Sequence, residues 1–242
     1  MTHLSRLLSI WLLFTSTTLF AQDSTDSLRV VTESLRTMFD TKDIAVLPSY
    51  TFQHQVHYTC FKISWKGEQN EAFDLLFNTG SGIIGMRTQR EQEGRKMDML
   101  MVFDHPALTT VNFVHSDTLN VAMRMRIPDP FKSKEQGVVN FKKTKEQRTI
   151  AGQRATKWTA EDGNEDIELW VAPVAVDVAP VFRAWGKLHG QPEVTRGDFE
   201  SGLVLAGSMK YKEGEKAHFT FEATEVKLDT PHNFSSEGYT VQ

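Results

Sequence analysis

Apolar and polar residues alternate with a period of two in one short segment after another of this chain, and turn residues separate the segments. Successive side chains of a β-strand point to opposite faces, so each segment is expected to form a strand. Strands that follow one another at this spacing are typical of an antiparallel meander. The segments are Tyr50 to Trp65, Glu71 to Phe77, Ile83 to Thr88, Lys96 to Phe103, Thr109 to His115, Leu119 to Ile127, Ala155 to Ala160, Ile167 to Val171, Leu203 to Tyr211 and Ala217 to Leu228.

Two of these segments change the face on which their apolar residues lie. Apolar residues from Phe52 to Cys60 share one parity and those from Phe61 to Trp65 the other, and a second slip falls between Ala223 and Val226. Such slips predict bulges or bends, which make a sheet coil rather than lie flat. Residues 26–39 and 178–189 show helical spacing instead. The predicted fold class is mainly β with a few helices: a strongly curved antiparallel sheet, or half-barrel, capped by those helices.

The first 21 residues have the pattern of an export signal. Arg6 supplies a positive charge, residues 7–20 form an apolar run, and Ala21 is a small residue at the expected cleavage point. A retained anchor is the alternative, but this run is short and contains several Ser and Thr, whereas a membrane span needs about 20 apolar residues. We expect a signal peptide over residues 1–21, one domain over residues 22–242, no integral membrane span after cleavage, and a periplasmic or secreted protein.

Charge and cysteine content exclude several classes of partner. The chain has 27 basic and 31 acidic residues, a net charge of −4, and no block of like charge, so no nucleic-acid partner is expected. Cys60 is the single cysteine, which excludes an internal disulfide and a lipid-attachment cysteine behind the signal.

Segments that resemble catalytic or metal sites each lack an essential residue. Residues Phe77 to Ser81 resemble the Asp-Thr-Gly-Ser loop of aspartic proteases, but Asn78 stands where a carboxylate must ionise. Oxygen ligands alternate from Asp162 to Asp166 as in a calcium loop, without its required glycine and glutamate. The histidines lack ligand spacing, and Cys60 has no activating neighbour. We therefore expect no enzyme activity, no metal and no cofactor; a hydrolase with a dispersed site is a third, weaker hypothesis.

Six of the nine methionines fall between residues 86 and 125. Unbranched thioethers repack around varied ligands, which predicts an adaptable apolar lining, although Met also fills gaps in ordinary cores. A copper(I) thioether site is a further alternative that no second cysteine or histidine pair supports. The residues predicted to line an apolar ligand site are Met97, Met99, Met101, Val111, Phe113, Met123 and Met125, with Trp170, Phe182 and Trp185 near its mouth.

Several short sequences follow one another from Val139 onward in the order of a known bacterial family. They are Phe141-Lys142-Lys143-Thr144, then Thr149-Ile150-Ala151-Gly152 followed by Lys157-Trp158, then Glu168-Leu169-Trp170-Val171-Ala172-Pro173, and finally Phe234 to Gly238-Tyr239. Over residues 139–242 the chain resembles domain-of-unknown-function family 4412. The family usually has a cysteine or small residue before the basic-aromatic pair; Ala155 stands there, so a redox role is not expected.

Family 4412 is similar to the outer-membrane lipoprotein carriers and sorting proteins. That resemblance implies a lipoprotein-carrier-like sheet around an apolar cavity capped by helices, a bacterial envelope location, and a lipid or lipoprotein partner. The leading hypothesis is an exported, non-enzymatic envelope protein that binds an acyl chain, lipid or lipoprotein in the hollow of its sheet. The alternative is an envelope scaffold or interaction protein whose own side chains fill that hollow.

Overall fold

The computed structural model describes residues 40–64, 67–79, 81–92, 94–104, 107–126, 141–162, 165–174, 202–211 and 218–242. These residues form fourteen strands. They are β1 (Ser49–Phe52), β2 (His54–Ser64), β3 (Gly67–Phe77), β4 (Ile83–Gln92), β5 (Arg95–Asp104), β6 (Thr109–Ser116), β7 (Leu119–Arg126), β8 (Lys142–Ile150), β9 (Gln153–Asp162), β10 (Glu165–Pro173), β11 (Gly202–Tyr211), β12 (His218–Lys227), β13 (His232–Ser235) and β14 (Thr240–Val241). The predicted signal peptide and both predicted helices lie outside the described residues.

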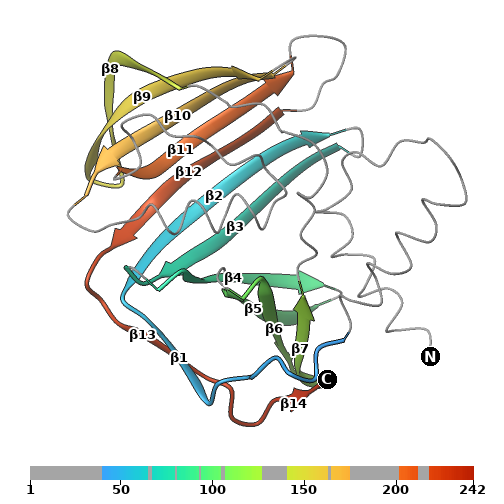
Figure 1. Ribbon diagram of the computed structural model, residues 1–242. Helices are drawn as coiled ribbons and strands as arrows, with labels where there is room; N and C mark the ends of the chain where they lie inside the picture. The colour runs from blue at the N-terminus through green and yellow to red at the C-terminus, as the bar shows by residue number, and fades with distance from the viewer. Residues whose placement is uncertain are drawn as a thin grey trace, which may run out of the picture.

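Twelve strands make one open sheet in the order β14-β7-β6-β5-β4-β3-β2-β12-β11-β10-β9-β8. Neighbouring strands are antiparallel except β14, which pairs parallel to β7. Figure 1 shows β9 to β12, β2 and β3 side by side in one twisted layer, from which β4 to β7 turn away. The predicted mainly antiparallel, curved sheet is therefore confirmed. The two runs of hairpins meet where β2 pairs with β12.

One of the two predicted parity slips is confirmed and the other is wrong. The register of β12 against β2 shifts between Ala223 and Glu225, as expected. In contrast, β2 pairs with β3 from His54 to Ser64 without a shift. Phe61 therefore alternates onto the other face of the sheet, where it is half-buried. The chain breaks its strand at Gln53 instead, between β1 and β2.

Asn78 stabilises the break at Gln53. Its side-chain Oδ1 accepts a hydrogen bond from the Gln53 backbone N–H at 2.7 Å, and its Nδ2 donates to the Thr51 carbonyl at 2.8 Å. Backbone groups that leave a β ladder need such partners, and a side-chain amide supplies both a donor and an acceptor. Asn78, which stands where an aspartic protease has its carboxylate, thus has a structural role: it holds the backbone between β1 and β2.

The register divides the side chains of the sheet between two faces. We call one the methionine face; it carries Met97, Met99, Met101, Phe103, Val114, Val121, Met123 and Met125, and continues through Ile84, Phe77, Leu75, Val56 and Tyr58. Phe77, Phe103 and Val56 are fully buried there. Burying a large apolar side chain contributes about 1.5–3 kcal/mol, so this face holds much of the core.

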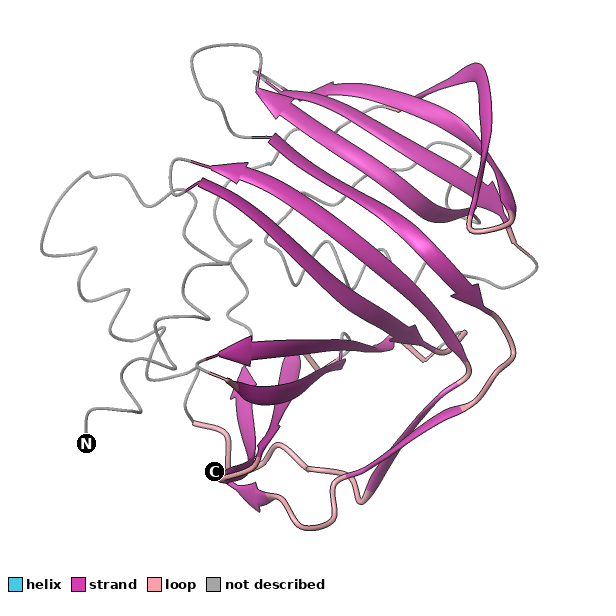
Figure 2. Cartoon of the chain, turned by 180° about the vertical axis from the view of Figure 1, so that it is seen from behind, coloured by secondary structure: helices cyan, strands magenta, loops and turns pink. Residues whose placement is uncertain are grey.

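A ribbon made of β1 and β13 covers the opposite face over β4 to β7 (Figure 2). Tyr50 and Phe52 of β1 form one buried cluster with Leu100, Val111 and Phe113, against which Phe234 and Tyr239 pack. Every residue of β6 from Thr109 to Val114 is consequently buried, on both faces. This arrangement explains why β6 has apolar residues on both faces, with Val111 and Phe113 under the ribbon and Val114 on the methionine face.

Strand β8 was not expected from the sequence, because it is polar and mostly exposed. It pairs with β9 through a two-residue turn in which Ala151 has φ 46° and Gly152 φ 78°. Positive φ at both central residues gives the turn whose twist fits a hairpin. An edge strand rich in charge resists pairing with other chains, which accounts for the composition of β8.

Candidate functional site

The predicted methionines of β5 and β7 come together on the methionine face. Met101 lies opposite Asn112 of β6, and Asn112 lies opposite Met123 of β7. In the next row Met99 forms a buried cluster with Val114 and Val121, against which Met97, Leu119 and Met123 pack. Side chains directly opposite in adjacent strands have Cβ atoms about 4.5–5.5 Å apart, so the methionines of β5 and β7 flank Asn112 and Val114 of β6 in one surface.

The methionines differ in exposure. Met99 and Met101 are 8% and 5% exposed, whereas Met97, Met123 and Met125 are half-buried. The surface is thus buried at Met99 and Met101 in the middle of β5 and more accessible at Met97, near the start of β5, and along β7. Because a methionine side chain has three rotatable bonds, the accessible part can change shape without breaking backbone hydrogen bonds.

Asn112 is a polar residue in the middle of this surface, and it is not among the residues that the sequence pattern predicts for the site. It is 3% exposed, and its Nδ2 donates to the Met125 sulfur at 3.4 Å. Its Oδ1 is buried and has no hydrogen-bond partner within the described part of the chain. A buried acceptor without a donor costs about 1–3 kcal/mol, which a donor from outside would recover. The available signal was a lone amide inside the apolar run of β6.

The remaining predicted site residues do not join the methionines. Val111 and Phe113 alternate with Asn112 and lie on the opposite face, beneath the β1–β13 ribbon. Trp170 of β10 also lies on the opposite face, because it pairs with Ala206 and Lys157 in the row that contains Glu222 and Thr59. Phe182 and Trp185 lie outside the described residues. Whether any of the ten binds a ligand stays a prediction.

Chemistry-bearing groups elsewhere are paired rather than assembled into a centre. His57 Nδ1 lies 2.7 Å from Asp74 Oδ1, and Arg87 contacts Asp98 through two hydrogen bonds. Among the described residues no group of three or more His, Cys, Asp or Glu side chains is placed to hold a metal ion. The described part of the chain also contains no helix of the length and hydrophobicity needed to span a membrane.

Cys60 should resist alkylation. Burial, followed by the charge of Glu71, raises the pKa of its thiol to about 12. The raised pKa favours the protonated form, and the nucleophile is the thiolate, so at pH 8 the reactive fraction falls about a thousandfold below that of a thiol of pKa 9. Iodoacetamide labelling of the native protein, followed by intact mass, should be correspondingly slower than labelling in urea. Equal rates in both conditions would contradict the proposed burial.

No family model matches the chain, so the resemblance to family 4412 is not confirmed, and no curated protein matches it. Among solved structures, PNGF-II is similar at 14% identity with a TM-score of 0.36, over 78% of this chain and 30% of that one. An outer-membrane lipoprotein-sorting protein domain from Vibrio parahaemolyticus is similar at 9% identity with a TM-score of 0.30, over 84% and 92%. A DUF1329 family protein from Desulfovibrio piger ATCC 29098 has 7% identity and a TM-score of 0.25, over 86% and 94%. With TM-scores below 0.5, these similarities do not indicate what this chain does.

Proposed function

We propose that the protein is an exported, non-enzymatic binding protein that holds an acyl chain, a lipid or the lipid part of a lipoprotein against the methionine face. The observation that carries this proposal is the set of half-buried thioethers, Met123 and Met125 on β7 and Met97 on β5, beside the buried Met99 and Met101. A flexible apolar surface suits an elongated apolar ligand without a fixed shape. The expected location is the periplasm or the exterior of a bacterial cell.

Apolar burial would supply most of the affinity, at about 25 cal/mol per Å² of surface removed from water. Such contacts discriminate weakly between chains of similar length, so broad specificity is expected. Asn112 offers the exception, because its unpartnered Oδ1 accepts a hydrogen bond. A ligand with a hydroxyl or amide N–H next to its apolar chain would satisfy that oxygen and would bind more tightly than a plain hydrocarbon.

The second candidate is an envelope scaffold whose own side chains fill the hollow. The nearly complete burial of Met99 and Met101 favours it, since these two residues already have the environment of an ordinary core. The two candidates differ in one measurable respect: only the first requires a small molecule on the methionine face.

Native mass spectrometry of detergent-free protein, purified from a bacterial periplasm, separates the two candidates. The binding protein should carry a lipid mass that organic extraction removes and added palmitate restores. Met123→Asp places a carboxylate on the methionine face and should lower palmitate uptake at least about tenfold, because burying an unpaired charge costs several kcal/mol.

Gln89→Asp is the matched control, because Gln89 is exposed on the opposite face of β4. It should bind palmitate like the wild type, and both variants should keep the wild-type circular dichroism spectrum. A wild-type protein that carries no lipid and takes up no palmitate would reject the binding protein and leave the self-filled scaffold.

A further inference from the structure

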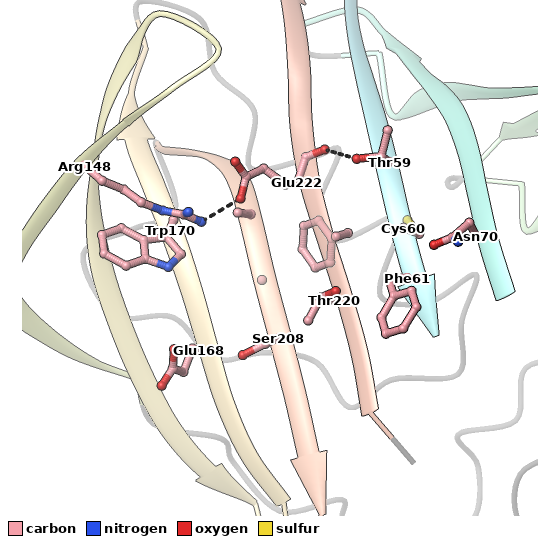
Figure 3. Close-up of a pocket in the computed structure, with 13 residues that line it drawn as sticks. Thr59, Cys60, Phe61, Asn70, Arg148, Glu168, Trp170, Ser208, Thr220 and Glu222 are labelled. Atoms are coloured by element: carbon pink, nitrogen blue, oxygen red, sulfur yellow. Dashed lines mark hydrogen bonds and ion pairs between the residues drawn. The ribbon is translucent and has the colours of Figure 1, made fainter. Parts of the chain in front are cut away.

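A pocket of about 360 Å³ lies on the face opposite the methionines, over β10, β11, β12, β2 and β3 (Figure 3). Its volume is within the range of small-molecule sites, about 300–1,000 Å³. Ala206 of β11 forms part of its wall, and its short side chain leaves room above the sheet. The core packs against one side of the pocket through Ala206, Trp170 and Phe221, and the rest of the lining is polar or charged apart from Phe61, Cys60 and Gly207.

Arg148 of β8 reaches over the sheet and closes one end of the pocket. Its Nη2 lies 3.0 Å from Glu222 Oε2 of β12, and its Cζ lies 4.5 Å from the centre of the Trp170 ring. Glu168, another lining residue, pairs with Lys157 at 3.3 Å. A guanidinium stacked on an indole and paired with a carboxylate is held by two interactions at once. The charges around the pocket are therefore balanced within the protein.

Most neutral polar side chains of the lining, unlike the charged ones, have no hydrogen-bond partner among the described residues. The indole N–H of Trp170, the hydroxyls of Ser208 and Thr220 and the amide of Asn70 make no hydrogen bond to any other described residue. They offer donors and acceptors together, because hydroxyls and amides act as both. The lining therefore offers a ligand neutral hydrogen-bonding groups and aromatic side chains.

The register sets these groups in a line across the strands. Asn70 lies opposite Phe61, Phe61 opposite Thr220, and Thr220 opposite Ser208. Trp170 lies in the adjacent row of β10, beyond Ala206. Adjacent strands are about 4.8 Å apart, so the two aromatic residues, Phe61 on β2 and Trp170 on β10, are separated by roughly 14 Å. The lining fits an elongated ligand that crosses the strands, with an aromatic group near each end.

We propose that this pocket binds a neutral oligosaccharide. Such a ligand presents many hydroxyls to groups like Ser208, Thr220 and Asn70, and presents apolar C–H faces to aromatic side chains. An anionic ligand would compete with Glu222 for Arg148, and a cationic ligand would compete with Lys157 for Glu168, whereas a neutral ligand leaves both pairs intact. The site is separate from the methionine face, so the protein would hold an apolar and a polar ligand on opposite sides of one sheet.

A glycan array that contains neutral and acidic oligosaccharides tests this proposal on the full mature chain. Neutral members should bind, and titration calorimetry with the strongest of them should give a measurable Kd. Trp170→Ala should weaken that Kd at least about tenfold, because it removes the indole N–H from the lining and the ring on which Arg148 is stacked. Ser208→Leu should do the same by filling the pocket, and it leaves the Trp170 region untouched if the first variant folds poorly.

Gln89→Asp, outside the pocket, is the control and should bind the same glycan with an unchanged Kd. Binding of acidic members only, binding of no member, or equal affinity of wild type and Ser208→Leu would each overturn the proposal. Palmitate uptake is measured on the same samples. A wild-type protein that binds the glycan but takes up no palmitate would reject the proposed lipid function alone. A wild-type protein that takes up palmitate but binds no glycan would reject the saccharide site alone.

Discussion

Replacing Phe113 with alanine should lower the free energy of unfolding by about 3–5 kcal/mol, the usual cost of deleting a buried phenyl ring. Phe113 is 1% exposed, and its ring centre lies 5.6 Å from that of Tyr50, 4.7 Å from that of Phe234 and 5.1 Å from that of Tyr239. Three aromatic side chains from both ends of the described chain thus converge on one ring. The resulting cavity would loosen the β1–β13 ribbon as well as the core of the sheet.

Urea unfolding followed by circular dichroism measures this loss. Phe219→Ala is the matched control. Phe219 lies at the start of β12, is 37% exposed and contacts Phe221. The free energy of unfolding of Phe219→Ala should fall by less than about 1 kcal/mol, because this side chain is already partly exposed and its removal loses little buried apolar surface. Equal losses in the two variants would show that Phe113 is not the centre of the packing between ribbon and sheet.

Gly85→Val should cost about 1–3 kcal/mol or more, for the opposite reason: too little space. A Cβ at Gly85 would lie 2.9 Å from Phe52 Cζ, 3.2 Å from Leu76 Cβ and 3.3 Å from Leu100 Cδ1. Phe52 is 1% exposed and cannot swing into solvent. The ribbon rests so closely on β4 at this point that only glycine fits beneath the ring.

A double-mutant cycle with Phe52→Leu tests that explanation. Removing the end of the ring should make room for the valine, so the double variant should be more stable than the sum of the two single losses predicts. Thermal unfolding of the four proteins gives the coupling. Strict additivity would mean that the cost of Gly85→Val comes from the β4 backbone and not from contact with Phe52.

The sequence predicts the sheet well because alternation is a local property. Ten segments were expected and all ten correspond to strands, and the slip after Ala223 is present as a register shift. The pairing of β1 with β13 could not be predicted, because it joins residues at opposite ends of the chain. Strand β8 was missed for a different reason: it is an exposed edge, so burial imposes no apolar pattern on it.

The candidate site was only partly predictable. Period-two spacing places Met97, Met99 and Met101 on one face, and the register adds Met123 and Met125 to it. Val111 and Phe113 were grouped with the methionines because β6 is apolar on both faces, and only the covering ribbon explains why. The pocket around Trp170 depends on Arg148 and Glu222, which are 74 positions apart in sequence and bridge β8 and β12.

The pairing of β1 with β13 should form late when the chain folds, because it joins residues at opposite ends of the described sequence. Thr51 and Asn233, whose side chains hydrogen-bond across this ribbon, are 182 residues apart. Contacts between such distant residues form late and slowly, because the entropy of closing the loop is lost before the contact is gained. During folding that proceeds from the N-terminus, Phe113 and its neighbours stay uncovered until β13 has been released. The segment that becomes β4 to β7 would therefore stay exposed longest and would depend most on a chaperone that shields its apolar surface.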